Sequence, residues 1–211
     1  MGLLIERDYT DLLKENMLSY YNEILTRRAI PETRDGLMEV QRRIIWTCYK
    51  NKWVSSRPFV KCAKINGMVL TYHPHGDSAV FDSLVNLSQD WKNHIPMIQT
   101  YGSNGSIYGD DPAAPRYLEA RLSKEAELIY GEDLSPDCVD YVDNYDLTEK
   151  EPVIMPGRLP VYLINGAFGI SGGYAISVPT HNPVEVIDET IKLIKNPNHQ
   201  VNLKPDFPNG G

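Results

Sequence analysis

The chain has 211 residues, 42% of them hydrophobic, which is enough for one large globular domain or two small ones. No apolar stretch approaches the roughly 20 residues of a membrane span, and the N-terminus lacks the layout of a secretory signal. We therefore expect a cytoplasmic protein with no membrane partner. The three cysteines are far apart and form no CxxC pair, which argues against a disulfide framework and a zinc cluster.

The net charge of −7 disfavours nucleic acid as a partner, but the charge is unevenly distributed. Residues 27–77 hold ten Lys or Arg against four Asp or Glu. A basic segment of an acidic chain can still bind a polyanion, because charges act over only about 10 Å in ordinary salt. A solvated charged surface explains the same counts, so charge alone leaves both interpretations open.

Hydrophobic periodicity predicts three helices in the first third of the chain. Residues 8–26 form an amphipathic pattern, and residues 37–50 predict a second helix with Arg42 and Arg43 off its apolar face. Residues 60–70 predict a short third helix.

The stretch "TYHPHGD" (71–77) predicts a tight turn before a fourth helix at 78–91. We expect Asp77 or Ser78 to cap this helix, and Ser78 and Asp82 to share a face that is free to meet a partner. The predicted order of a helix at 60–70, a tight turn and a helix at 78–91 is the layout of a helix-turn-helix, a motif that binds DNA. The expected buried stripe is Val80, Leu84 and Leu87.

The rest of the chain predicts an α+β fold. Glycine-separated, β-prone pieces at 95–115 indicate a hairpin or wing. Residues 117–133 predict a helix with an apolar side of Leu118, Leu122 and Ile129. After about residue 135, β-branched residues and Gly/Pro turns predict strands, and residues 183–195 predict a last helix. We place a domain boundary near 135–150.

The dipeptide Arg116-Tyr117 is a candidate for nucleophilic chemistry. Pro115 biases Ala114 away from helical geometry, so we expect the predicted helix to begin just after Tyr117. Unpaired N–H groups at a helix start attract phosphate, and an arginine can hold two phosphate oxygens at once. A tyrosine there is competent to attack a phosphodiester. A partly buried aromatic role is the alternative, since the chain has 13 tyrosines.

Two further patterns leave alternatives open. His73, His75 and Asp77 fit a capped turn, phosphate contacts or, less well by spacing, a metal site. Ile170, in the glycine-rich "NGAFGISGG", is either a core residue or an exposed wedge that separates stacked bases. The local sequence favours the core.

Several long motifs together resemble the A subunit of bacterial type IIA DNA topoisomerases, gyrase A and topoisomerase IV A. The resemblance covers about residues 20–211, and the motifs occur in the family's order: "RAIPETRDGLMEVQRRII", "YHPHGDSAVFDSLVNLSQ", "GSIYGDDPAAPRYLEARLSK", "VDNYDLTEKEPVIMP", "LINGAFGISGGYAISVPTHNPVEVID" and "PDFPNGG". It implies an N-terminal helical arm at 1–26, a winged-helix domain at 27–135 and the first part of a β-rich tower domain at 136–211, truncated relative to the family.

The resemblance also implies site residues. Tyr117 is expected to attack DNA and stay linked to a 5′ phosphate, Arg116 to orient that phosphate, and Arg28 to act across the dimer on the partner's site. The expected DNA contacts are Arg42, Arg43, His73, His75, Ser78 and Ile170, with Ile170 inserting between base pairs. Ser78 and Asp82 match positions associated with quinolone binding.

By resemblance, this chain binds no cofactor itself, because Mg²⁺ and ATP belong to the B subunit. The expected partners are double-stranded DNA, a second copy of this chain and the B subunit. Together they form an A2B2 complex that changes DNA supercoiling by passing one duplex through another. A non-catalytic winged-helix module that binds DNA or another protein chain is the alternative. Met38, Gln41, Pro115 and "TYGSNGS" depart from the usual motifs and indicate a divergent member.

Overall fold

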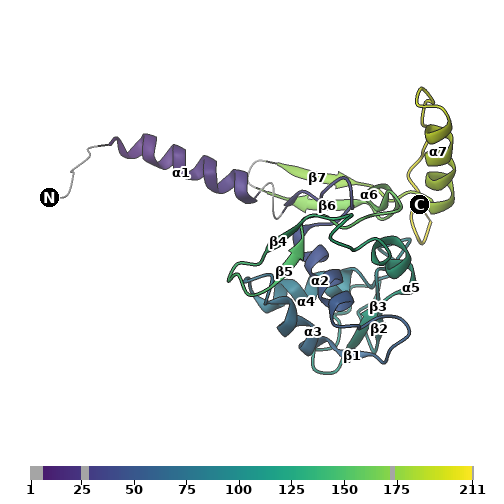
Figure 1. The fold of residues 1–211 in the computed structure, drawn as a ribbon, viewed down its shortest axis with the longest axis horizontal. Helices are drawn as coiled ribbons and strands as arrows, with labels where there is room; N and C mark the ends of the chain where they lie inside the picture. The colour runs from purple at the N-terminus through teal and green to yellow at the C-terminus, as the bar shows by residue number, and fades with distance from the viewer. Residues whose placement is uncertain (1–6, 25–28, 172–173, 211) are drawn as a thin grey trace.

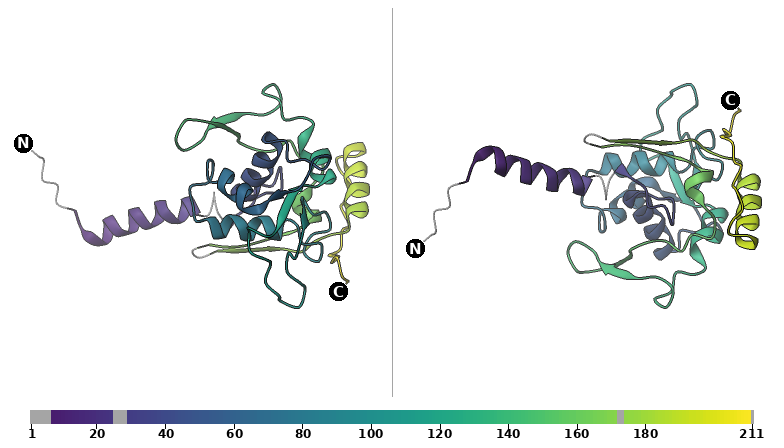
Figure 2. Two further views of the ribbon diagram at one scale, coloured as in Figure 1. Left: turned by 90° about the horizontal axis from the view of Figure 1, so that it is seen from below. Right: turned by 90° about the horizontal axis from the view of Figure 1, so that it is seen from above.

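The computed structural model describes residues 7–24, 29–171 and 174–210. Helix α1 (Tyr9–Ile24) projects away from the body in every view, and helix α7 (Pro183–Lys195) stands at the opposite end (Figures 1 and 2). The helix predicted at 8–26 is confirmed over 9–24, although Leu12, Leu13, Met17 and Tyr20 remain exposed. Within the described residues, no helix combines the length and hydrophobicity needed to cross a membrane.

Three helices build the centre of the protein: α2 (Glu39–Lys50), α3 (Cys62–Val69) and α4 (Asp77–Asn86). They confirm the helices predicted from periodicity and pack against one another around a shared core. Burial of such side chains from water is the main source of their stability. The core side chains from these helices include Ile44, Ile45, Cys48, Ile65, Val69, Val80 and Leu84.

The ends of α4 differ from the prediction. Gly76 occupies the N-cap position and no side chain caps the helix, so the capping roles expected of Asp77 and Ser78 are wrong. The helix stops at Asn86 rather than 91. The side-chain amide of Asn93 donates to the Asn86 carbonyl at 2.7 Å and satisfies a group that a longer helix would have used.

A small antiparallel sheet lies beside the helices, in the order β1 (Val60–Lys61), β3 (Glu119–Leu122), β2 (Ile98–Tyr101). The hairpin predicted within 95–115 is correct only for its first strand, because β2 pairs with β3, which lies beyond that range. The helix predicted at 117–133 is wrong at its start, because alternate residues of this segment are buried, as in a strand. Those residues are Leu118, Ala120 and Leu122.

After β3 the chain turns through the short helix α5 (Lys124–Ala126) and the π-helical turn η2 (Glu127–Gly131). The Ser123 hydroxyl accepts the Ala126 N–H at 3.0 Å and starts α5.

Two hairpins follow, which confirms the predicted strands and the α+β class. They are β4 (Tyr141–Asp143) with β5 (Lys150–Pro152), and β6 (Ala167–Ile170) with β7 (Ala175–Val178). Helix α6 (Val161–Ile164) precedes β6. Helix α7 has the predicted bounds, and Asn182 caps it by accepting the Val184 N–H at 3.0 Å.

One hydrophobic core crosses the predicted domain boundary. Met155 and Val161 belong to the same buried cluster as the three central helices. The buried Asp35 carboxylate accepts the Met155 N–H at 3.0 Å, and the Asp35 backbone carbonyl accepts the Tyr130 hydroxyl at 2.6 Å. The division at residues 26 and 135 stays a prediction, but the packing is continuous across residue 135.

Candidate active site and nucleic-acid surface

Tyr117 lies on the surface, in a turn at 115–117 that leads into β3. Its side chain is 64% exposed, so the phenol is reachable from solvent. The turn closes through hydrogen bonds from the N–H groups of Tyr117 and Leu118 to the Ala114 carbonyl, at 2.8 and 3.2 Å. Since a strand follows, Tyr117 does not sit at a helix start, and the expected attraction of phosphate by a helix terminus there is wrong.

A different helix start holds this turn in place. At the beginning of α3, the Cys62 N–H donates to the Leu118 carbonyl at 2.9 Å and the Ala63 N–H donates to the Pro115 carbonyl at 3.0 Å. The first N–H groups of a helix have no partner within it. Here they bind the tyrosine turn, which fixes the position of Tyr117 relative to the helical core.

Arg116 brings a cation to the tyrosine ring. Its guanidinium carbon lies 4.7 Å from the centre of the Tyr117 ring, and its side chain is exposed. Among the described residues, no ion pair with a carboxylate engages Arg116, so its planar fork is open to an anion such as phosphate. The pair therefore presents a phenol and a phosphate-binding group on one surface.

The neighbouring thiol does not compete as a nucleophile. Cys62 is fully buried at the start of α3, and burial raises the pKa of its thiol to about 12. The thiolate is the reactive form of cysteine, so Cys62 stays protonated and serves packing.

Arg42 and Arg43, predicted DNA contacts, are both engaged inside the protein. Arg42 forms two hydrogen bonds with the Asp35 carboxylate, at 2.6 and 3.2 Å. Arg43 forms two with Glu151, at 2.7 Å each, and lies 3.1 Å from Glu39. Neither guanidinium can meet a phosphate through these atoms without breaking its ion pair.

The two predicted histidines lie together at the turn before α4. The imidazoles of His73 and His75 stack, with ring centres 4.3 Å apart, and His73 Nδ1 lies 2.9 Å from Arg43 Nη1. His75 is exposed. Across the described part of the chain, no three His, Cys, Asp or Glu side chains gather as a metal-binding group.

The outer face of α4 carries Ser78 and Asp82, and both side chains are exposed as predicted. The expected inner stripe is confirmed, since Val80, Leu84 and Leu87 are buried. Helix α4 therefore offers a polar face on the surface of the protein.

Ile170 lies at the end of β6 and is 70% exposed, so the core interpretation favoured by the local sequence is wrong. The hairpin is held close to the body at Gly169, where a Cβ would lie 2.0 Å from the Ala29 carbonyl oxygen. No larger residue fits at position 169, and alternation then directs Ile170 outward. Arg28, the third predicted catalytic residue, lies outside the described residues.

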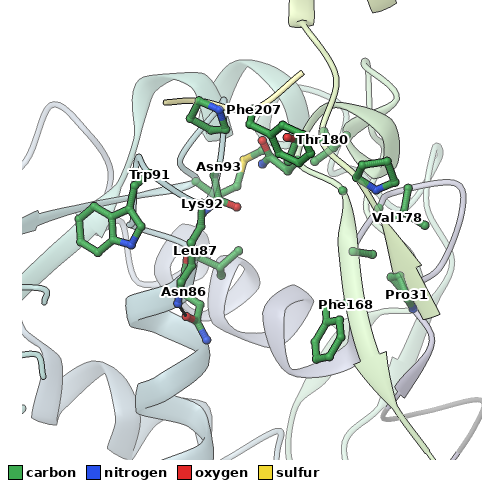
Figure 3. A pocket seen from close by; sticks show the side chains of 18 of the residues that line it. Pro31, Asn86, Leu87, Trp91, Lys92, Asn93, Phe168, Val178, Thr180 and Phe207 are labelled. Atoms are coloured by element: carbon green, nitrogen blue, oxygen red, sulfur yellow. Dashed lines mark hydrogen bonds between the residues drawn. The ribbon is translucent and has the colours of Figure 1, made fainter. Parts of the chain in front are cut away.

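A groove of about 870 Å³ separates the β6–β7 hairpin from the segment after α4. Trp91 and Lys92 lie on one side, Phe168 and Val178 on the other, and Phe207 closes one end (Figure 3). Lys92 is the sole charged residue among the described residues that line it, so the groove lacks the acids and bases of a catalytic site. Tyr117 does not line it.

One contact of the tyrosine turn escaped the sequence analysis. The Lys61 ammonium donates to the Tyr117 carbonyl at 3.2 Å, across a sequence separation of 56 residues. No motif joins these positions. The pairing of β1 with β3 and the hydrogen bonds at the start of α3 bring them together.

Comparison with known proteins places these features in a family. A sequence profile of the A subunit of DNA gyrase/topoisomerase IV matches residues 28–211. The chain is 42% identical to the DNA gyrase A subunit of Granulibacter bethesdensis, with 100% of the chain and 23% of the relative aligned. It is 45% identical to the DNA topoisomerase 4 A subunit of Staphylococcus epidermidis, over 95% of the chain and 26% of the relative.

A third relative is the chloroplastic/mitochondrial DNA gyrase A subunit of Arabidopsis thaliana, 45% identical over 93% of the chain and 22% of the relative. The chain thus spans about a quarter of the length of these relatives. It belongs to the family of DNA gyrase and topoisomerase IV A subunits.

Proposed function

We propose that the chain is the DNA-cleaving part of a type II topoisomerase A subunit, with Tyr117 as the nucleophile. The observation that carries the proposal is the exposed Tyr117 phenol beside the Arg116 guanidinium, which has no carboxylate partner among the described residues. Family membership supports it, because the named relatives are topoisomerase subunits.

The proposed reaction is a transesterification. The Tyr117 oxygen attacks a backbone phosphorus of DNA and loses its proton, while the bond to the 3′ oxygen breaks and that oxygen leaves as a hydroxyl. The product is a 5′-phosphotyrosyl ester, and the reverse reaction reseals the strand without an energy source. Arg116 is placed to hold the scissile phosphate, and Arg28 is proposed to act on the partner chain's site.

Mg²⁺ and ATP are proposed to come with the B subunit, in an A2B2 complex that passes one duplex through another. Mg²⁺ would stabilise the charge on the oxygens of the reacting phosphate. The residues of this chain supply the nucleophile and part of the phosphate site.

The proposed DNA surface runs from the tyrosine turn to α4 and the β6–β7 hairpin, in a winged-helix and tower arrangement. Exposure supports roles for His75, Ser78 and Ile170. The contacts predicted for Arg42 and Arg43 require their ion pairs to open. His73 is half-buried, and its Nδ1 lies 2.9 Å from Arg43 Nη1. Ser78 and Asp82 are proposed as drug-site positions by resemblance.

Replacing Tyr117 with Phe tests the proposal. The change removes one exposed hydroxyl, so the free energy of unfolding should change by no more than about 0.5 kcal/mol. With a B subunit, Mg²⁺ and supercoiled DNA, a detergent quench should trap tyrosine-linked DNA with the unmodified chain and none with Tyr117→Phe. Tyr108→Phe is the matched control, since Tyr108 is an exposed tyrosine in the same loop.

A protein–DNA adduct formed by Tyr117→Phe would exclude Tyr117 as the nucleophile. DNA binding by the unmodified chain with no adduct under any of these conditions would instead support the non-catalytic alternative.

A further inference from the structure

The structure places one lysine side chain on the backbone of the tyrosine turn. We propose that Lys61 is a positioning residue for Tyr117, holding the turn at 115–118 so that the phenol meets the scissile phosphate. The inference rests on the proposed function for its catalytic consequence. Its structural part can be tested without activity.

Three hydrogen bonds tie the turn to the junction of β1 and α3. Two come from backbone N–H groups, those of Cys62 and Ala63, and involve no side chain. The third runs from Lys61 Nζ to the Tyr117 carbonyl, at 3.2 Å. It is the one link of the three that a substitution can remove while the main chain stays unchanged.

The Lys61 bond acts on the nucleophile itself. Within the described residues, it is the sole hydrogen bond to the Tyr117 carbonyl, whereas Cys62 and Ala63 bind the carbonyls of Leu118 and Pro115. Without it, the peptide between Tyr117 and Leu118 keeps only one hydrogen bond, from the Leu118 N–H to the Ala114 carbonyl at 3.2 Å, and its carbonyl end is no longer held. Catalytic rates depend steeply on such placement, because a shift of about 1 Å in a reacting group can cost roughly a hundredfold.

Glu119 holds the ammonium in position. Its carboxylate lies 2.9 Å from Lys61 Nζ, and the two residues are directly paired between β1 and β3. Lys61 is therefore engaged by a carboxylate and a carbonyl, whereas Arg116 beside the ring has no such carboxylate partner in the part of the chain that the structure describes. The geometry assigns positioning to Lys61 and phosphate contact to Arg116.

The ion pair is half-exposed, and exposed pairs contribute little to stability. Lys61→Met keeps the aliphatic stem and removes the ammonium, so we expect a folded variant. Lys61→Arg restores a cationic donor. Lys64→Met is the matched control, because Lys64 lies three residues on, with its ammonium over the Trp53 ring.

The first measurement is the rate of tyrosine-linked DNA formation at saturating DNA, with Mg²⁺ and the B subunit. We expect Lys61→Met to lower this rate by about ten- to a hundredfold, Lys61→Arg to recover most of it, and Lys64→Met to match the unmodified chain. The salt dependence of DNA affinity should be the same in all four proteins. An unchanged rate in Lys61→Met overturns the proposal. So does a salt slope lower by about one unit with an unchanged saturated rate, which would make Lys61 a phosphate contact.

The second measurement needs neither DNA nor a partner. Amide hydrogen exchange at Tyr117 and Leu118, whose N–H groups close the turn onto Ala114, should be faster in Lys61→Met than in Lys61→Arg or Lys64→Met. Exchange in α4 should not change. If the unmodified chain forms no adduct, the proposed function fails, yet this experiment still decides whether Lys61 holds the turn. Equal exchange rates at Tyr117 and Leu118 in Lys61→Met and the unmodified chain would overturn the positioning role of Lys61.

Discussion

The guanidinium of Arg43 and the carboxylate of Glu151 form two parallel hydrogen bonds, each 2.7 Å long, although the residues are 108 positions apart. Arg43 also contacts Glu39 within α2 and His73 in the turn before α4. One side chain therefore joins α2, the β4–β5 hairpin and the segment that leads to Ser78. A bidentate pair of this kind fixes geometry as well as charge.

We predict that Arg43→Ala destabilises the protein by about 3 kcal/mol, because it leaves the largely buried Glu151 carboxylate without its partner. Urea unfolding measures the change. Arg57→Ala, on the exposed Arg57, should alter the free energy of unfolding by less than about 0.5 kcal/mol. Equal effects of the two substitutions would show that the Arg43 pair is only an ordinary surface contact.

Leu147 gives a second prediction, about the turn between β4 and β5. Its backbone φ is 61°, in the left-handed region, and its side chain is 77% exposed. A Cβ is unfavourable in this conformation, so Leu147→Gly should raise the free energy of unfolding by about 0.5–1 kcal/mol. Leu147→Ala keeps the Cβ and should bring no such gain. Thermal and urea unfolding of both variants decide the matter, and identical stabilities would contradict the strain.

The third prediction concerns acid. Hydrogen bonds from Lys192, His199 and the Asn202 N–H lower the pKa of Glu189 from 4.5 to about 2. A lowered pKa in the folded state stabilises the protein above the unfolded-state value, and this contribution is lost as the pH falls from about 4.5 to about 2.

Glu189→Gln should therefore flatten the decline of the melting temperature between about pH 4.5 and pH 2. The control Asp90→Asn, on an exposed carboxylate, should keep the steep decline of the unmodified chain. Glu32, whose pKa is also lowered to about 2 by Arg34, titrates in all three proteins and cancels in the comparison. Parallel curves for Glu189→Gln and the unmodified chain would refute the assignment.

The exposure of Ile170 gives a fourth prediction. Ile170→Ala should change the free energy of unfolding by less than about 0.5 kcal/mol, whereas Ile164→Ala, at a fully buried position, should cost about 2–5 kcal/mol. If Ile170 inserts between base pairs, its alanine variant should also bend bound DNA less, which fluorescence transfer between duplex ends measures. If Ile170→Ala lost as much stability as Ile164→Ala, the side chain of Ile170 would have to be buried in the folded protein.

The elements that follow simple periodicity were predictable, and those decided by contacts distant in sequence were not. Helix α7 has its predicted bounds because a capping Asn182 and an amphipathic pattern are both local. The segment from Leu118 to Leu122 satisfies the helical spacing i, i+4 and the strand alternation equally. This segment forms a strand because it pairs with both β1 and β2.

The site shows the same division. Motifs identified Tyr117 and Arg116. Both side chains lie on the surface, with the Arg116 guanidinium carbon 4.7 Å from the centre of the Tyr117 ring. Composition could not show that Arg42 and Arg43 have carboxylate partners. The partner of Arg43, Glu151, is distant in sequence, and Asp35, the partner of Arg42, lies in the preceding loop, where no helical spacing applies. The exposure of Ile170 depends on the close approach of Gly169 to Ala29, which a local pattern of small residues does not reveal.

The carboxylate of Asp35 binds the Met155 N–H, 120 residues further along the chain. A nascent polypeptide leaving the ribosome therefore exposes its early helices well before their final partners are synthesised. Contacts between residues this far apart in sequence slow folding, and apolar surface stays exposed while the chain is incomplete. The expected consequence of this long-range contact is slow folding, with longer exposure of apolar surface, rather than weak final stability.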